Sequence, residues 1–222
     1  MSQDDAHVVS RQWSEWRAET DLEEYYSRWQ RLEASGQSPH GEADFVESLH
    51  PRTVLDAGCG MGRVAIELAR RGIDVVGIDL DDDLLSFARR SQPSITWVLD
   101  DLATMNLDRR FDVVAMAGNV MAFCPTADRP ALIRNAAAHI EPDGLLVAGF
   151  QLGFGQEPLG LAEYDRLCSA AWLELSERWA TWDKRPYDGG DYAVSIHRRA
   201  VNHEVAKLRT EASHGSSPWA RS

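Results

Sequence analysis

The chain has 222 residues, 44% of them apolar, which is enough to bury one substantial core and predicts a single domain. With 35 acidic against 23 basic residues, its formal net charge of -12 argues against a nucleic-acid backbone or an anionic membrane surface as the main partner. The cysteines Cys59, Cys124 and Cys168 include no CxxC pair, so we expect neither a disulfide framework nor a bound metal.

The first residues, Met1 to Arg11, are polar and acidic and lack the apolar stretch of a secretory signal. No apolar run in the sequence approaches the roughly 18 residues of a membrane helix. We therefore expect a cytoplasmic protein that does not interact with membranes. The pattern does not predict an oligomeric state.

The N-terminal segment, residues 1–50, has aromatic side chains at helical spacing, among them Trp13 and Trp16, and then a break rich in glycine and proline. One interpretation is a helical segment that packs permanently on the rest of the domain. The other is a lid that covers a ligand and excludes water. The lid hypothesis rests on three side chains: Tyr25, Tyr26 and Trp29.

From Val54 onward, short β-branched runs alternate with helical patterns: TVLDA, GRVAIELARRG, DVVGIDL, DDLLSFARR, ITWVL and FDVVAMA. This alternation predicts βαβαβ units and a mostly parallel sheet, that is, an α/β fold. A second half follows, with a helix over 128–139, a turn over 141–144, a strand over 145–150 and a helix over 159–171.

The last two predicted strands differ from the others because only the turn-rich KRPYDGG separates LELSERWATWD from DYAVSIHRR. A link this short permits an antiparallel hairpin but no helical crossover. We expect a catalytic core over 51–200, within a domain of residues 1–200. Residues 201–222 read as a polar, partly disordered tail.

The strongest local signal is a strand that ends in Asp56, followed by Gly58, Gly60 and Gly62 and then a helix from Arg63. Glycines there allow a sharp turn and a close approach of the backbone to a ligand, and free amides at the helix start point towards it. The stretch GMGRVA also fits the dinucleotide pattern G-x-G-x-x-[GA], with Asp79 near the expected distance for a ribose-binding acid. An NAD(P)-dependent oxidoreductase is therefore one alternative.

The ordered set VLDAGCGMGR, VVGIDLDDDLL, WVLDDLATM, FDVVAMAGNVM and EPDGLLVAGF resembles the class I S-adenosylmethionine (SAM)-dependent methyltransferases from about Thr53 to Arg199. The resemblance implies a Rossmann-like three-layer sandwich with a seven-stranded sheet of order 3-2-1-4-5-7-6, strand 7 antiparallel, and SAM across the carboxyl ends of the strands. It also implies methyl transfer with release of S-adenosylhomocysteine (SAH). We expect a small-molecule acceptor, because the core leaves little sequence for a separate recognition domain and the composition is acidic. A SAM-binding or interaction protein without turnover is the other alternative.

The resemblance also implies which residues bind SAM. Asp79 offers two acceptors to the ribose hydroxyls, Leu80 lies against adenine, and a backbone carbonyl at Ala117 accepts from the ammonium group. Asp100 or Asp101 takes the exocyclic amine of adenine in a turn that includes Leu102. The remaining expected contacts come from the glycine turn: Asp56, Gly58, Cys59, Gly60 and Gly62.

Methyl transfer from SAM is an in-line displacement that needs a base only when the acceptor must lose a proton. The sequence identifies no catalytic residue, and His40, Glu42 and Asn119 are the weak candidates. Cys124 reads as a small apolar residue. The sequence AGNVM after the fourth strand is not the N-P-P-[YF] of amino-methylating nucleic-acid enzymes, so no nucleic-acid substrate is expected.

Overall fold

The structure is a computed structural model that describes residues 9–35 and 38–200. The predicted polar tail over 201–222 and the Gly36 part of the predicted N-terminal break lie outside the described residues. Within the described ranges, no helix is long and apolar enough to cross a membrane.

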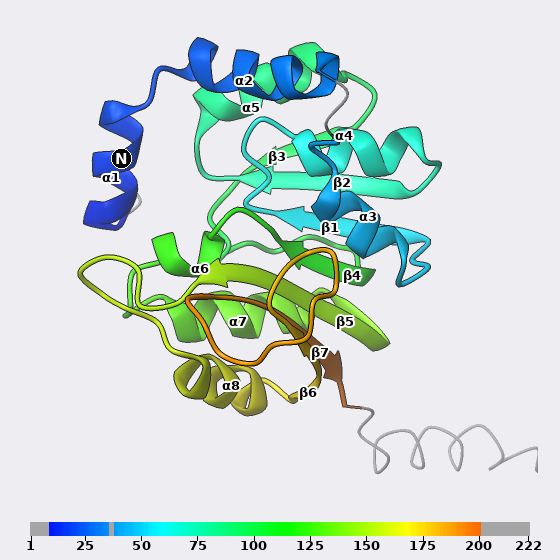
Figure 1. The fold of residues 1–222 in the computed structure, drawn as a ribbon. Helices are drawn as coiled ribbons and strands as arrows, with labels where there is room; N and C mark the ends of the chain where they lie inside the picture. The colour runs from blue at the N-terminus through cyan, green and yellow to red at the C-terminus, as the bar shows by residue number, and fades with distance from the viewer. Residues whose placement is uncertain (1–8, 36–37, 201–222) are drawn as a thin grey trace, which may run out of the picture.

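A seven-stranded sheet with the order β3-β2-β1-β4-β5-β7-β6 forms the centre of the molecule (Figure 1). Neighbours from β3 to β5 pair in parallel, and β7 runs antiparallel to both β5 and β6. The predicted order and the antiparallel terminal hairpin are therefore confirmed. The strands are β1 (Thr53–Ala57), β2 (Asp74–Asp79), β3 (Thr96–Leu99), β4 (Phe111–Met116), β5 (Ile140–Gln151), β6 (Leu173–Trp179) and β7 (Tyr192–Arg199).

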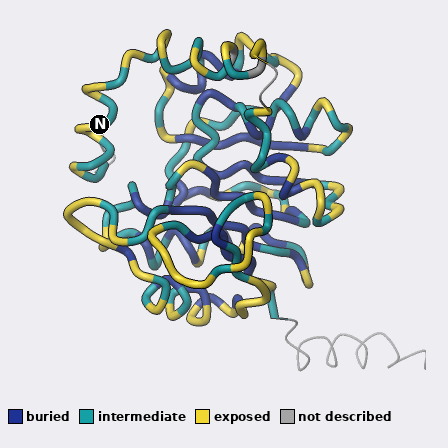
Figure 2. Tube along the Cα trace, in the orientation of Figure 1, coloured by how far each residue is buried: buried dark blue, intermediate teal, exposed yellow. Residues whose placement is uncertain are grey.

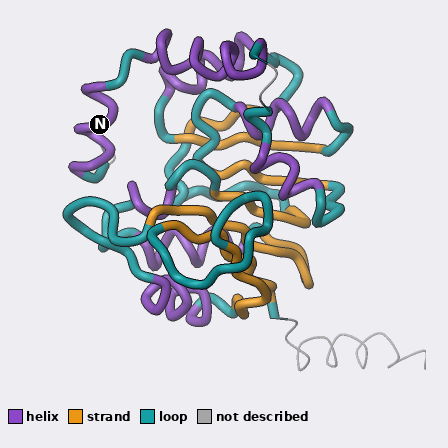
Figure 3. Tube along the Cα trace, in the orientation of Figure 1, coloured by secondary structure: helices purple, strands orange, loops and turns teal. Residues whose placement is uncertain are grey.

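Helices cover both faces of this sheet, which gives the three layers of a Rossmann-like fold (Figure 3). One face packs against α3 and α4, and the other against α7 and α8. Figure 2 shows the strands as the most deeply buried part of the chain. The helices are α1 (Arg11–Glu19), α2 (Leu22–Ala34), α3 (Gly41–Glu47), α4 (Arg63–Arg70), α5 (Asp82–Ser91), α6 (Val120–Phe123), α7 (Arg129–Ala138) and α8 (Leu161–Ala170).

The strand β5 is longer than predicted. Ile140 pairs with Phe111 and Leu145 with Val113, so the predicted turn over 141–144 lies opposite a single residue of β4 as a bulge. Asp143 adopts a φ of 64°, and a Cβ on Gly144 would lie 2.9 Å from the carbonyl oxygen of Asp112. The turn residues therefore bend one continuous strand, where the sequence pattern predicted a turn that precedes the strand.

The two N-terminal helices pack on the core near the ends of β1 and β2. Side chains of α1 and α2 contact Met61, Leu84 and Phe87 in a small apolar cluster. Arg17 of α1 donates to Asp81 and Asp83 over distances of 2.9 and 2.6 Å. Because Asp81 also caps α5 by accepting from the Leu84 amide, this contact joins α1 to the loop that follows β2.

Candidate functional site

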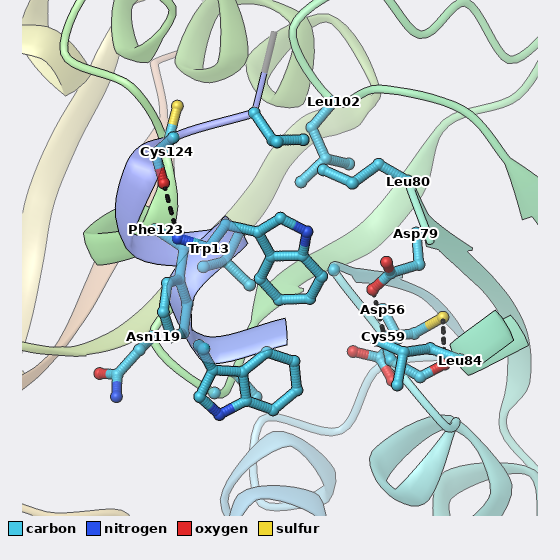
Figure 4. Close-up of a pocket in the computed structure, with 18 of the residues that line it drawn as sticks. Trp13, Asp56, Cys59, Asp79, Leu80, Leu84, Leu102, Asn119, Phe123 and Cys124 are labelled. Atoms are coloured by element: carbon cyan, nitrogen blue, oxygen red, sulfur yellow. Dashed lines mark hydrogen bonds between the residues drawn. The ribbon is translucent and has the colours of Figure 1, made fainter. Parts of the chain in front are cut away.

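A cavity of about 440 Å³ lies where β1 to β4 end, next to α1 and α2 (Figure 4). Its volume falls in the range of small-molecule and cofactor sites. The lining brings together most of the residues predicted from the sequence to bind a cofactor: Asp56, Gly58, Cys59, Gly60, Asp79, Leu80, Asp100, Asp101, Leu102 and Ala117.

Two glycines of the turn after β1 adopt left-handed backbone conformations that favour glycine. Gly58 has a φ of 77° and Gly60 a φ of 54°. A Cβ on Gly60 would meet no atom within 4 Å, so the missing side chain leaves space for a ligand. The amides of Gly58 and Cys59 donate to the carbonyl of Ile78, which ties the turn to the end of β2.

The third glycine of the turn, Gly62, was also expected to contact the cofactor, and it lies outside the cavity lining. Gly62 has a φ of 81° at the start of α4, and a Cβ there would lie 2.4 Å from the Trp97 ring. Its missing side chain therefore lets α4 pack closely on β3.

Asp79 ends β2 with a buried carboxyl, 7% exposed, at the edge of the cavity. One oxygen accepts from the Gly60 amide over 2.7 Å and the other from the Asp81 amide over 3.0 Å. Burial raises the pKa of Asp79 to about 6, although these backbone hydrogen bonds act to lower the pKa. Each carboxylate oxygen has a second acceptor position, so the group is still able to receive hydroxyl donors from a ligand.

Asp56 has a structural part in the same turn. Its carboxyl is 2% exposed and accepts from the Ala65 amide over 3.0 Å, which fixes the first turn of α4 against the end of β1. Burial raises the pKa of Asp56 to about 7. Figure 4 shows Asp56 beside Asp79 and Cys59, on the far side of the cavity from Phe123.

The turn after β3 places two carboxyls and one apolar side chain at the cavity. Asp100 accepts from the Asp101 amide over 2.8 Å, and Asp101 accepts from the Ala103 amide over 2.7 Å. Both carboxyls thus shape the turn as well as line the cavity. Leu102 is buried and Leu80 is exposed at 38%, and both also line the cavity.

Of the three weak candidates for a catalytic role, only Asn119 lines the cavity. Its side-chain oxygen accepts from the Gln151 amide over 2.8 Å, which joins the ends of β4 and β5. In Figure 4 its amide group points away from Asp79. This contact gives Asn119 a positioning role in the structure.

The other two candidates, His40 and Glu42, lie outside the cavity lining. Glu42 binds Arg63 through both carboxylate oxygens, one of them 2.9 Å from the guanidinium. The His40 ring lies 3.8 Å from the carboxylate of Glu67. Both side chains therefore connect the start of α3 to α4.

Two of the three lid candidates, Tyr25 and Trp29, line the cavity, and Tyr26 does not. The Tyr26 hydroxyl lies 2.9 Å from the hydroxyl of Ser91, and its ring packs on Phe87. Neighbouring residues of a helix point in different directions, and here Tyr25 faces the cavity while Tyr26 faces α5. Tyr26 instead anchors α2 to α5.

Six aromatic side chains line the cavity and touch one another in an unbroken row, which we call the aromatic wall. Consecutive ring centroids in this row lie 5.8, 5.6, 4.9, 5.7 and 6.1 Å apart. The row joins α1 and α2 to α6 and to the loop after β5. In order, its members are Phe154, Phe123, Trp13, Trp16, Tyr25 and Trp29.

Phe123, Phe154 and Arg63 also line the cavity, although the sequence pattern does not predict them there. The spacing of Trp13 and Trp16 is typical of one helix face, and this pattern could have predicted that the two rings lie together in the aromatic wall. Phe123 and Phe154 carry no such signal because they come from a short helix and a loop.

The cysteines of the cavity are poor nucleophiles at neutral pH. Burial raises the pKa of Cys59 well above its usual value and the pKa of Cys124 to about 12. Among residues 9–35 and 38–200, no group of three or more His, Cys, Asp or Glu side chains is arranged to hold a metal ion.

Comparisons with known proteins relate the chain to one enzyme class. Residues 54–144 match the family model of a methyltransferase domain. A TehB-like SAM-dependent methyltransferase from Corynebacterium glutamicum is 33% identical with a TM-score of 0.74, and the match covers 80% of this chain and 97% of that chain. A SAM-bound amino pentose methyltransferase from Micromonospora echinaspora has a TM-score of 0.66 at 21% identity and shares the fold, with 82% of this chain and 98% of that chain covered.

Among the curated relatives, a dTDP-3-amino-3,4,6-trideoxy-alpha-D-glucopyranose N,N-dimethyltransferase from Streptomyces venezuelae is 32% identical over 108 residues. The match covers 47% of this chain and 46% of that relative, so the chain spans less than half the length of this protein.

Proposed function

Because the chain belongs to the class I SAM-dependent methyltransferases, we propose that it transfers the methyl group of SAM to a small-molecule acceptor and releases SAH. One observation carries the proposal: the glycine turn after β1 and the Asp79 carboxyl meet in one cavity of about 440 Å³ at the strand ends. The acidic net charge of -12 supports a small-molecule acceptor over a nucleic acid.

The described residues fit SAM in charge and shape. Gly60 leaves open space at the cavity, as does Gly118 after β4, where a Cβ would also meet no atom within 4 Å. The Asp79 carboxylate would hold the ribose hydroxyls, and the Ala117 carbonyl the ammonium group. Leu80 and Leu102 would enclose adenine, with an acid of the Asp100–Asp101 pair on its exocyclic amine.

When bound, SAM supplies a methyl group that its sulfonium already activates. The protein then has to align donor and acceptor and keep water out. The aromatic wall provides the apolar enclosure, and Asn119 fixes the end of β4 against β5. No histidine or lysine is present among the described lining residues, which favours catalysis by positioning.

The lid hypothesis extends the proposal to α1 and α2. Asp79 accepts a hydrogen bond from the backbone amide of Asp81, and the Asp81 carboxylate in turn binds Arg17 of α1. A ligand whose hydroxyls bind Asp79 would therefore lie next to the residue that holds α1 in place. We propose that Tyr25 and Trp29 close over bound ligand and that this closure is tighter with SAM or SAH than without.

Isothermal titration calorimetry with SAH and with NAD tests the donor assignment. We expect SAH to bind and NAD not to bind. Binding of NAD without SAH would instead support the oxidoreductase alternative. Incubation with isotopically labelled SAM and a broad metabolite extract then separates an enzyme from a SAM-binding protein, because only an enzyme yields a labelled product by mass spectrometry.

A further inference from the structure

The aromatic wall and the strand ends make two chemically different sides of one cavity. Figure 4 shows Asp79, Asp56 and Cys59 on one side and Phe123 on the other, with the Trp13 indole between them. The row of ring contacts extends beyond Trp13 over Trp16 and Tyr25. A flat ring is the shape that stacks best on such a surface.

The charges of the lining are almost all negative. Among the described lining residues the one cationic side chain is Arg63, which stands against five aspartates: Asp56, Asp79, Asp100, Asp101 and Asp128. Arg63 is already engaged, because it binds Glu42 and the carbonyl of Pro39, and its guanidinium lies 4.4 Å from the Trp29 ring centroid. An anionic substrate would therefore meet no available countercharge in this part of the structure, whereas a cation would meet favourable partners.

The described lining contains no histidine or lysine, and its possible bases are carboxylates, Asp128 at the start of α7 among them. A carboxylate is a much weaker base than an alkoxide, a phenolate or an alkylamine. The raised pKa of Asp56, about 7, would suit a base, but this carboxyl is 2% exposed, accepts from the Ala65 amide and lies across the cavity from Phe123. Alcohols, phenols and alkylammonium groups all have to lose a proton before or during methylation. A ring nitrogen that is uncharged at neutral pH does not.

We propose that the acceptor is a planar heteroaromatic ring with an uncharged ring nitrogen and no anionic substituent. This inference rests on the proposed function. The nitrogen lone pair forms the new N–CH3 bond while the S–CH3 bond breaks and its electron pair stays on sulfur. No proton moves, and one positive charge passes from the sulfonium to the ring. The aromatic faces and the carboxylates stabilise that charge before and after transfer.

Binding to the full chain saturated with SAH tests the inference without turnover. N-methylisoquinolinium and 2-naphthoate have nearly the same shape and opposite charges, and 2-naphthol is their neutral counterpart. We expect calorimetry to give at least about tenfold tighter binding of N-methylisoquinolinium than of 2-naphthoate, with 2-naphthol between them. Equal or tighter binding of 2-naphthoate would overturn the inference.

Variants locate the effect on the aromatic wall. Phe123→Leu is expected to weaken N-methylisoquinolinium binding about tenfold and to change SAH binding less than about threefold, because Phe123 lies opposite Asp79. Trp172→Leu is the matched control, since Trp172 is 72% exposed and outside the cavity lining, and it should change neither. An unchanged N-methylisoquinolinium affinity in Phe123→Leu would contradict the proposed surface.

Turnover completes the test. With labelled SAM and equal concentrations of isoquinoline, 2-naphthol, 2-naphthoate and cyclohexylmethylamine, we expect labelled N-methylisoquinolinium in at least about tenfold excess over any other product. Preferential labelling of another compound would overturn the acceptor class and leave methyl transfer standing. SAH binding without N-methylisoquinolinium binding would also overturn the acceptor class alone, whereas a failure to bind SAH would remove the proposed function itself.

Discussion

The two sides of the cavity differ in how they are held as well as in what they contain. The carboxyls of Asp56 and Asp79 are buried and tied by hydrogen bonds to the backbone amides of Ala65, Gly60 and Asp81. In the part of the chain that the structure describes, the rings of the aromatic wall show no side-chain hydrogen bond to the backbone. They contact one another, and those of α1 and α2 also pack on the apolar cluster around Met61. The difference indicates a fixed site for a common donor beside a more adaptable surface for the acceptor.

The largest predicted effect tests whether the strand-end side binds the donor. Gly60→Val should weaken SAH binding by about 100-fold or more, because the side chain would fill the cavity. It should also cost about 1 to 2 kcal/mol of stability, since the φ of 54° is left-handed.

Gly72→Val is the matched control for this change. Gly72 has a φ of 85° and equally open space for a Cβ, but it lies at the far end of α4 and outside the cavity lining. Thermal unfolding should show a similar loss of stability, with SAH affinity kept. Parallel losses of affinity in both variants would place the donor elsewhere.

The next effect concerns the hydrogen bonds of one carboxyl. Asp79→Ala should weaken SAH binding by about 1.5 to 3 kcal/mol, the usual range for losing hydrogen bonds to a charged group. Asp74→Ala, at the exposed start of the same strand, should leave binding unchanged. Calorimetry on both proteins gives the comparison, and equal affinities would exclude Asp79 from the donor site.

A pH titration sharpens the same assignment. The pKa of Asp79 is about 6, so the carboxylate accepts ligand hydroxyls above this pH and is protonated below it. SAH affinity should therefore fall as the pH is lowered from 7 to 5, with proton release on binding below pH 6. Asp79→Asn, which carries no titrating proton, should remove this part of the pH dependence. A pH profile of the same steepness in both proteins would contradict the prediction.

The smallest predicted effect tests whether α1 and α2, which carry most of the aromatic wall, close over a bound ligand. Arg17→Gln breaks two partly exposed ion pairs, with Asp81 and Asp83, each worth about 0 to 1 kcal/mol, so SAH affinity should fall by a few-fold at most. Hydrogen exchange should show that SAH protects residues 10–35 in the parent and protects them less in Arg17→Gln. Arg11→Gln, which removes a surface pair within α1, is the control. If SAH leaves this exchange unchanged in the parent, α1 and α2 are permanently packed and the lid hypothesis is wrong.

The strand-end side was accessible to sequence reasoning because its geometry is local. The spacing of Gly58 and Gly60 predicts a tight turn directly, and Asp79 is the last residue of an unbroken strand pattern. The aromatic wall depends on how distant segments pack, so Phe123 and Phe154 were not identifiable. Tyr25 and Tyr26 lie on different faces of α2, and the sequence pattern did not predict which face of that helix turns to the cavity. The packing of α3 on α4 likewise leaves His40 and Glu42 outside the cavity lining.

Trp97 of β3 fills the volume of two absent side chains at once. A Cβ on Gly62 or on Gly77 would each lie 2.4 Å from its ring, and its indole nitrogen donates to the carbonyl of Gln92. Gly62 also has a φ of 81°, where any side chain would be strained, so a smaller residue at position 97 would not by itself admit a larger one at 62. Relatives with a smaller residue at position 97 are therefore expected to carry a larger one at 77 and to keep glycine at 62, so variation at position 77 would report on side-chain volume at β3.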